Sequence, residues 1–179
     1  PIGLHCIGGV IKHVAALTAI GSPTVNSYRR LWDTGFWAPV FADWGYQNRT
    51  CALRISAPGR FEYRSVDATV NPYLMAAALL KSFDDGIRSK LDPGEPEERN
   101  IYAAMEAGKQ VKKLPMSLGD ALTALENDDV VKSAMPDEMY RVFKDAPDVL
   151  TRTLDIAERC NLKLEKVSSP FPHFDVPPG

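Results

Sequence analysis

Charged side chains gather in one strand-forming stretch of the sequence, at residues 48–73. We expect strands over CALRIS and RFEYRSV, where the two-residue alternation of side chains separates an apolar face from a charged face. The apolar face holds Leu53, Ile55, Phe61 and Tyr63. The charged face holds Arg54, Glu62 and Arg64, and Arg49 and Asp67 flank it. Guanidinium and carboxylate groups therefore lie on one side of the predicted sheet.

Between residues 24 and 70 every basic residue is arginine, although lysine is nearly as common over the whole chain. These residues are Arg29, Arg30, Arg49, Arg54, Arg60 and Arg64. Arginine presents a planar fork of donors that grips phosphate or carboxylate with two hydrogen bonds. A carboxylate among them could also hold a divalent cation, which prefers oxygen ligands. The pattern favours a site for an anionic ligand, and the alternative is a solvated strand face.

The composition of the 179-residue chain is that of a globular domain, with 45% hydrophobic and 25% charged residues. We expect one domain with an appendage. A net charge of -2 argues against a nucleic-acid or membrane-surface binder. Cys6, Cys51 and Cys160 lack metal-binding spacing, so we expect reduced thiols in a cytoplasmic protein. No apolar run approaches the roughly 18 residues of a membrane span, and the chain begins without methionine or a signal sequence, as a fragment would.

Two helices flank the charged stretch. The first is expected over residues 10–20, after a break at Gly8 and Gly9, and the second over residues 72–90, with Asn71 as its N-cap. Apolar spacing in the second helix predicts a packing stripe of Ala76, Leu80, Phe83 and Ile87. We interpret His13 as a hydrogen-bonded structural residue. For His5, next to the predicted glycine break, a ligand role and a structural role are equally open.

The remaining segments are less regular. Residues 32–46 are rich in aromatic side chains, which either belong to the core or wall a nucleotide or active-site entrance, and residues 38–46 predict a strand. Residues 92–98 predict an acidic surface loop. Short helices are expected near residues 101–107, after the Ser117 and Asp120 capping pattern, and from Pro136.

Several motifs, in order along residues 1–143, resemble the C-terminal half of the glutamine synthetase catalytic domain. They are HCIGGVIKH, SPTVNSYRRL, NRT and GRFEYRSVDATVNPYL. The resemblance implies an α+β fold in which an antiparallel-type sheet fragment packs with helices. It also implies ATP-dependent ligation of ammonia or a small amine to the γ-carboxylate of glutamate through γ-glutamyl phosphate, with Mg or Mn as cofactor, in a cytoplasmic homo-oligomer.

The same resemblance implies roles for individual residues. His5 and Glu62 look like ligands of one metal ion, and Arg30 like the group that holds the glutamate carboxylate. Arg49 would contact the transferred phosphate, and Arg54 and Arg64 would complete the nucleotide and substrate clamp. Asn26 belongs to the same substrate-binding or ATP-binding set.

Two departures from the family pattern change these expectations. Trp37 stands where many glutamine synthetases have a glutamate, and RLWDTGFWAP resembles γ-glutamylmethylamide synthetases, so we expect a small alkylamine as the preferred amine. The family's N-terminal domain and the acidic strands that supply most metal carboxylates are absent from the sequence. We therefore expect negligible activity from this chain alone.

The C-terminal residues 144–179 resemble a different protein. DAPDVLTRTLDIAERCNLKLEK and the proline-rich PFPHFDVPPG look like the segment after the PHP domain of the bacterial replicative DNA polymerase alpha subunit. We expect a helix followed by an extended, proline-rich tail, joined to the main domain between residues 136 and 145. His173 has no partner at metal-ligand spacing, and we interpret it as structural.

Two alternatives to the ligase remain open. In the first, the chain is a noncatalytic interaction module whose arginine face binds a partner or a regulatory anion. In the second, the chain is a piece of a DNA replication polymerase subunit.

Overall fold

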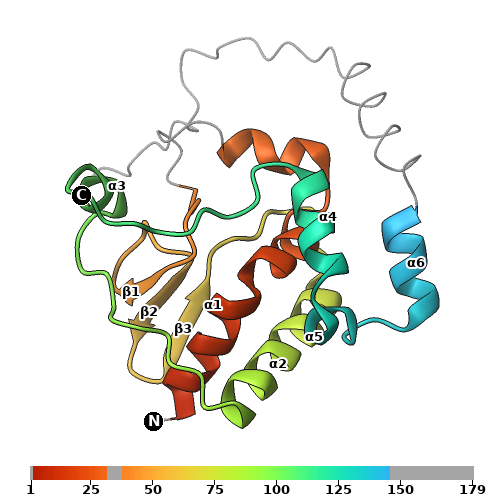
Figure 1. Ribbon diagram of the computed structural model, residues 1–179, viewed down its shortest axis with the longest axis horizontal. Helices are drawn as coiled ribbons and strands as arrows, with labels where there is room; N and C mark the ends of the chain where they lie inside the picture. Colours follow the sequence, from red (N-terminus) through yellow and green to blue (C-terminus); the bar gives the residue numbers. More distant parts are fainter. Residues whose placement is uncertain (1, 32–37, 146–179) are drawn as a thin grey trace, which may run out of the picture.

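The computed structural model describes residues 2–31 and 38–145 and has the expected α+β class (Figure 1). The elements in chain order are α1 (Ile2–Gly21), the 3-10 helix η1 (Val25–Leu31), β1 (Trp44–Tyr46), β2 (Leu53–Ala57), β3 (Arg60–Tyr63), α2 (Pro72–Arg88), α3 (Ile101–Glu106), α4 (Leu118–Glu126), α5 (Asp129–Lys132) and α6 (Asp137–Asp145). The predictions for Trp37, Cys160, His173 and the tail beyond residue 145 lie outside the described residues.

Helix α1 runs without interruption through Gly8 and Gly9, so the predicted break is wrong. A Cβ on Gly9 would lie 2.0 Å from the carbonyl oxygen of Ser82, and a Cβ on Gly86 would lie 2.1 Å from that of His5. Glycine at these positions lets α1 and α2 approach closely. This packing outweighs the low helix propensity of glycine, which costs about 1 kcal/mol per residue.

The same close approach corrects the predicted packing face of α2. Ala76 is exposed, and the Leu80 side chain is 64% exposed. Phe83 and Ile87 are only half-buried. The buried face instead carries Leu74, Met75, Ala78, Ser82 and Gly86. Small residues occupy the contact with α1 because a larger side chain would separate the helix backbones.

Local capping signals are confirmed at two helices. The side chain of Asn71 accepts hydrogen bonds from backbone N–H groups in the first turn of α2, and Pro72 occupies the first position of that helix. At α4, the Ser117 side chain accepts a hydrogen bond from the backbone N–H of Asp120. The predicted helix after Pro136 is α6, which has no buried residue.

The three strands form a mixed sheet in the order β1-β2-β3, so the predicted antiparallel arrangement is correct only for β2 and β3. Strand β1 pairs parallel to β2. The strand predicted over residues 38–46 is reduced to Trp44–Tyr46, and before it Phe41 makes an isolated bridge to Lys113. The apolar face of the sheet packs on the helices. There the rings of Phe61 and Phe83, the latter from α2, meet edge-on with their centroids 5.4 Å apart.

One helix in the described part of the chain, α1, is long and apolar enough to cross a membrane, with a mean hydropathy of 1.4. The sequence had predicted no such run. Within the fold, α1 contacts α2, α4 and α5, and Val10, Leu17 and Ile20 are almost wholly buried in the core. A core helix therefore accounts for its apolar composition.

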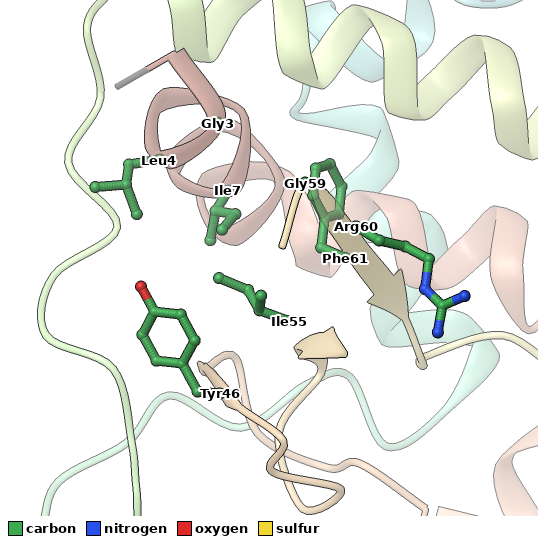
Figure 2. A pocket seen from close by; sticks show the side chains of 8 residues that line it. All are labelled: Gly3, Leu4, Ile7, Tyr46, Ile55, Gly59, Arg60 and Phe61. Atoms are coloured by element: carbon green, nitrogen blue, oxygen red, sulfur yellow. The ribbon is translucent and has the colours of Figure 1, made fainter. Parts of the chain in front are cut away.

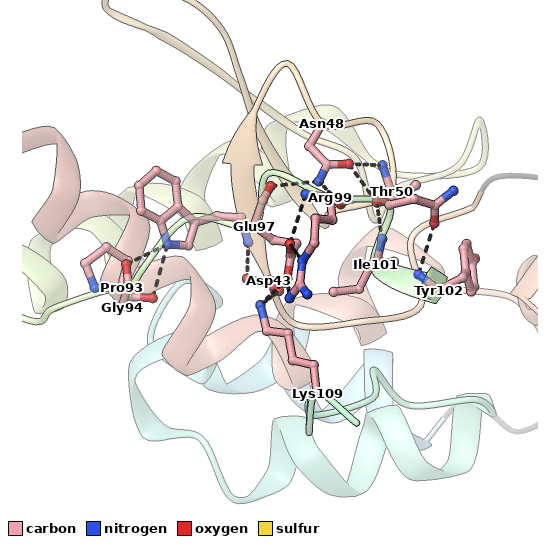
Figure 3. Close-up of polar contacts among 12 residues, drawn as sticks. Asp43, Asn48, Thr50, Pro93, Gly94, Glu97, Arg99, Ile101, Tyr102 and Lys109 are labelled. Carbon is pink, nitrogen blue, oxygen red and sulfur yellow. Dashed lines mark hydrogen bonds and ion pairs between the residues drawn. The ribbon is translucent and has the colours of Figure 1, made fainter. Parts of the chain in front are cut away.

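The acidic loop predicted at residues 92–98 is only partly a surface loop, because Glu97 is 3% exposed. Lys109 Nζ lies 2.6 Å from Glu97 Oε2 and 3.1 Å from Asp43 Oδ2, and Arg99 Nε donates to Glu97 Oε1 (Figure 3). The hydrogen bond from Arg99, helped by Lys109, lowers the pKa of Glu97 to about 2 although burial opposes it. Backbone N–H of Glu97 also donates to Trp44 O, so this network holds the loop against β1.

His13 is a buried structural residue, as predicted. Its Nδ1 lies 2.6 Å from Asp128 Oδ2 and its Nε2 lies 2.9 Å from Asp85 Oδ2. Burial alone would lower the pKa of His13, but the hydrogen bonds and charges of Asp128 and Asp85 outweigh it and raise the pKa. His13 therefore joins α1 to α2 and to the start of α5.

Candidate functional site

The charged face of the sheet is built as the alternation predicted. Arg54 and Glu62 are register partners across β2 and β3. Arg54 Nη1 lies 3.2 Å from Glu62 Oε2, and Arg64 Nε lies 3.0 Å from Glu62 Oε1. One carboxylate thus bridges two guanidinium groups, and we call Arg54, Glu62 and Arg64 the arginine–glutamate cluster.

Two neighbouring residues orient this cluster. Arg54 Nη2 donates to Gln47 Oε1 at 2.6 Å, and Arg64 Nη1 donates to the backbone carbonyl of Arg49. Gln47 was not among the residues predicted from the sequence. Its signal was its place directly after β1, because the parallel register pairs Tyr46 with Ile55 and so brings the end of β1 beside β2.

The cluster carries excess positive charge. The side chains of Arg54 and Arg64 are 16% and 17% exposed, and that of Glu62 is 46% exposed. Burial lowers the pKa of Arg64, while the charge of Glu62 opposes this effect. Two guanidinium groups share one carboxylate, and Arg54 Nε is buried without a hydrogen-bond partner among the described residues. This arrangement can attract a phosphate or a carboxylate.

Arg30 lies apart from the cluster, in η1. No ion pair or hydrogen bond joins it to Arg54, Glu62 or Arg64 within residues 2–31 and 38–145. Its charge instead acts on Asp67, which follows β3. Asn26, in the same 3-10 helix, is exposed. The fold therefore brings together part of the predicted substrate set and leaves Arg30 and Asn26 on η1, outside the arginine–glutamate cluster.

The two predicted metal ligands do not meet. His5 lies on α1, where its Nδ1–H donates to the carbonyl of Leu91 at 2.9 Å. Helix α1 covers the Phe61 face of the sheet, whereas Glu62, the next residue of β3, points to the other face. His5 therefore lies within the continuous helix α1 and not, as predicted, next to a glycine break.

The described residues by themselves do not fit a metal ion. They contain no group of three or more His, Cys, Asp or Glu side chains that could hold one. Both oxygens of Glu62 are engaged by arginine. Glu62 could supply one oxygen ligand, and a hard cation such as Mg²⁺ needs several more.

A cavity of about 280 Å³ opens on the helix-covered side of the sheet (Figure 2). Leu4 and Ile7 of α1 face Tyr46, Ile55 and Phe61 across it. Its lining is mostly apolar. Because the cavity lies on the helix-covered side of the sheet, it is separate from the arginine–glutamate cluster, which lies on the opposite face.

Comparison with known proteins decides the family. Residues 1–149 match the family described as glutamine synthetase, catalytic domain. This chain belongs to the glutamine synthetase family. The match extends past the predicted join at residues 136–145 and includes α6. It stops before most of the tail, so the polymerase resemblance stays a prediction.

Known glutamine synthetases are similar over the same region. That of Pyrococcus furiosus is 47% identical over 149 residues, which cover 79% of this chain and 34% of the relative. The glutamine synthetase of Rhizobium leguminosarum is 41% identical over 146 residues, which cover 79% of this chain and 34% of the relative. The chain thus spans about one third of the length of these glutamine synthetases.

Solved structures of the same fold are described as GmaS. A GmaS/ADP complex is 35% identical, with a TM-score of 0.78, covering 87% of this chain and 37% of that one. Apo GmaS without ligand is 33% identical, with a TM-score of 0.76, and the match covers 92% of this chain and 39% of the GmaS chain. The arrangement of helices and mixed sheet in this glutamine synthetase segment is therefore that of GmaS.

Proposed function

We propose that this chain supplies the arginine-rich part of an active site for ATP-dependent ligation of ammonia or a small amine to the γ-carboxylate of glutamate. The observation that carries the proposal is the arginine–glutamate cluster on a solvent-facing sheet surface, within a glutamine synthetase segment. The ADP bound in the GmaS complex supports a nucleotide as one ligand of this fold.

The chemistry has two steps. Transfer of the γ-phosphoryl group of ATP to the glutamate γ-carboxylate forms γ-glutamyl phosphate and releases ADP. The amine then attacks the acyl carbon, loses a proton and displaces phosphate. Both steps place negative charge on phosphate oxygens, which fixed guanidinium groups stabilise.

Each residue has a proposed role in that sequence. Arg54 and Arg64 bind phosphate oxygens, with Gln47 holding Arg54 in position. Arg49 contacts the transferred phosphate, since its backbone already adjoins Arg64. Arg30, with Asn26 beside it, binds the glutamate carboxylate. Glu62 orients the guanidinium groups and is a candidate ligand for Mg or Mn.

This chain alone is proposed to be inactive, because it spans a third of its relatives and does not assemble a metal site from its described residues. The 179-residue chain should therefore form no glutamine or γ-glutamylmethylamide from ATP, glutamate and either amine. Formation of either product at a rate that depends on Arg54 would refute this part of the proposal. We propose that the active form is a cytoplasmic homo-oligomer of the longer enzyme, and that methylamine competes with ammonia in it.

ADP binding to the 179-residue chain tests the cluster directly. Arg54→Lys keeps the charge but removes the planar fork, so calorimetry should show weaker ADP binding. Arg88→Lys is the matched control, because Arg88 is exposed on α2 and, among residues 2–31 and 38–145, forms an ion pair with Asp84 alone. Equal ADP affinity in wild type and Arg54→Lys would overturn the assignment and favour the interaction module.

A further inference from the structure

Three hydroxyl groups where η1 adjoins the end of β3 and the residues after it are buried without hydrogen-bond partners in the described part of the chain. They belong to Tyr28, Tyr63 and Ser65, and the Nε and Nη2 atoms of Arg30 share this condition. Tyr28 and Ser65 are 1% and 2% exposed. An unpaired buried polar group costs about 1–3 kcal/mol, so several at one place call for an explanation beyond packing.

These groups belong to one site. Burial raises the pKa of both Tyr28 and Tyr63, and the charge of Arg30 acts against that rise at each of them. Ser65 and Thr18 flank the Tyr63 hydroxyl without completing a hydrogen bond to it. Tyr28 and Arg30 come from η1, and the other two come from the end of β3 and the residues after it. The site is the junction of these two segments.

Asp67, on which the charge of Arg30 acts, forms no ion pair with Arg30 in the described part of the chain. Asp67 accepts hydrogen bonds from the backbone N–H and Oγ1 of Thr69 at 2.8 Å and 2.6 Å. Hydroxyl oxygens can accept hydrogen bonds from a guanidinium while leaving its charge intact. This differs from the arginine–glutamate cluster, in which a carboxylate offsets part of the charge.

We propose that Tyr28, Tyr63 and Ser65 are positioning residues. Their hydroxyl oxygens hold the Arg30 guanidinium through bridging water, so that its charge is presented to a substrate carboxylate. The proposal rests on the role of Arg30 in the proposed function. Nε and Nη2 form one edge of the guanidinium fork, so fixing this edge fixes the plane of the whole group.

The test uses the 179-residue chain and the exchange rate of the Arg30 Nε proton, measured by ¹⁵N NMR. Tyr63→Phe and Ser65→Ala remove a hydroxyl with little change of shape. Loss of one hydrogen bond to a charged group should speed exchange by about tenfold or more. Tyr102→Phe is the control, because its hydroxyl lies 3.5 Å from the carbonyl of Ala38, away from this site. Unchanged exchange in both variants, with unchanged thermal stability, would overturn the proposal.

Glutamate titration of the same spectra separates this inference from the proposed function. If Arg30→Lys abolishes glutamate-induced shifts and Tyr63→Phe weakens them, both stand. If Arg30→Lys abolishes them and the hydroxyl variants have no effect on shifts or exchange, only the positioning role fails. If Arg30→Lys leaves glutamate-induced shifts unchanged, the proposed role of Arg30 fails.

Discussion

Replacing His13 by glutamine tests whether one charged imidazole ties three helices together. Both ring nitrogens contact carboxylate oxygens, which only accept hydrogen bonds, so both must carry a proton and His13 is positively charged. Hydrogen bonds to charged groups contribute about 1.5–3 kcal/mol each. The side chain of Asp85 is 20% exposed and also binds Lys12, so we take the low end of this range for its hydrogen bond with His13. We expect His13→Gln to lower the free energy of unfolding by about 3–4 kcal/mol where His13 is charged.

The pH dependence of this loss follows from the direction of each pKa change. The folded pKa of His13 is raised above 6.5, so its contribution is fully present below pH 6.5 and is lost as the pH rises through the folded value. Hydrogen bonds from Lys12 and His13 lower the pKa of Asp85 to about 2. That contribution is present above the unfolded value of 3.8 and is lost as the pH falls towards 2. The difference in free energy of unfolding between wild type and His13→Gln, called the gap below, is therefore largest between pH 3.8 and pH 6.5.

Urea unfolding of both proteins from pH 5 to pH 9 measures the gap. Lys12→Gln is the control, since Lys12 binds the same Asp85 oxygen from a side chain that is 49% exposed. Its effect should be small and constant over this range. A His13→Gln gap that is equally large at pH 5.5 and pH 9 would refute the charged state, and no gap at any pH would refute the tie itself.

Three further substitutions test the packing and the caps. Gly86→Ala should destabilise the chain by about 1–3 kcal/mol or more in urea unfolding, because its Cβ would overlap the backbone of α1. Gly119→Ala should not destabilise the chain, because its Cβ would only reach ordinary contact, 3.9 Å from Ser117 Oγ. Equal stability of the two variants would contradict the close contact between α1 and α2. Glu97→Gln should lower the free energy of unfolding by about 2–4 kcal/mol at pH 7, and this difference should shrink as the pH falls from 4.5 towards 2. Glu126→Gln, which breaks an exposed ion pair, is the control. A loss of stability in Glu97→Gln no greater than in Glu126→Gln would show that the buried network is dispensable. Ser117→Ala should cost about 1 kcal/mol through loss of the α4 cap, and an unchanged urea midpoint would argue against the cap.

Signals that act over a few residues predicted the structure correctly. The N-caps Asn71 and Ser117 needed only the residues of the following turn. The alternation around Arg54 and Glu62 needed only the period of a strand, and cross-strand pairing then put both on one face. These features follow from local geometry, so no knowledge of the rest of the fold was required.

Features that depend on a distant segment were missed. Gly9 suggested a helix break, but its role is to admit the backbone of α2. The stripe through Leu80 had the right period but the wrong face, because the contact with α1 selects small residues rather than the most apolar ones. Glu97 read as a surface acid because Lys109, which pairs with its carboxylate, and Trp44, which accepts from its backbone N–H, are distant in sequence.

In the proposed function, the arginine–glutamate cluster is a binding surface that folds before its ligand arrives. Arg54 and Arg64 are mostly removed from water, which would be costly for unpaired charges. Glu62 offsets this cost with a single negative charge. Because one carboxylate serves two guanidinium groups, the cluster is stable enough to form yet keeps unsatisfied donor capacity, including Arg54 Nε. A second carboxylate would stabilise the sheet further and would leave less positive charge for an incoming phosphate. Under the proposed function, the ratio of arginine to glutamate on this face is therefore a compromise between folding and anion binding.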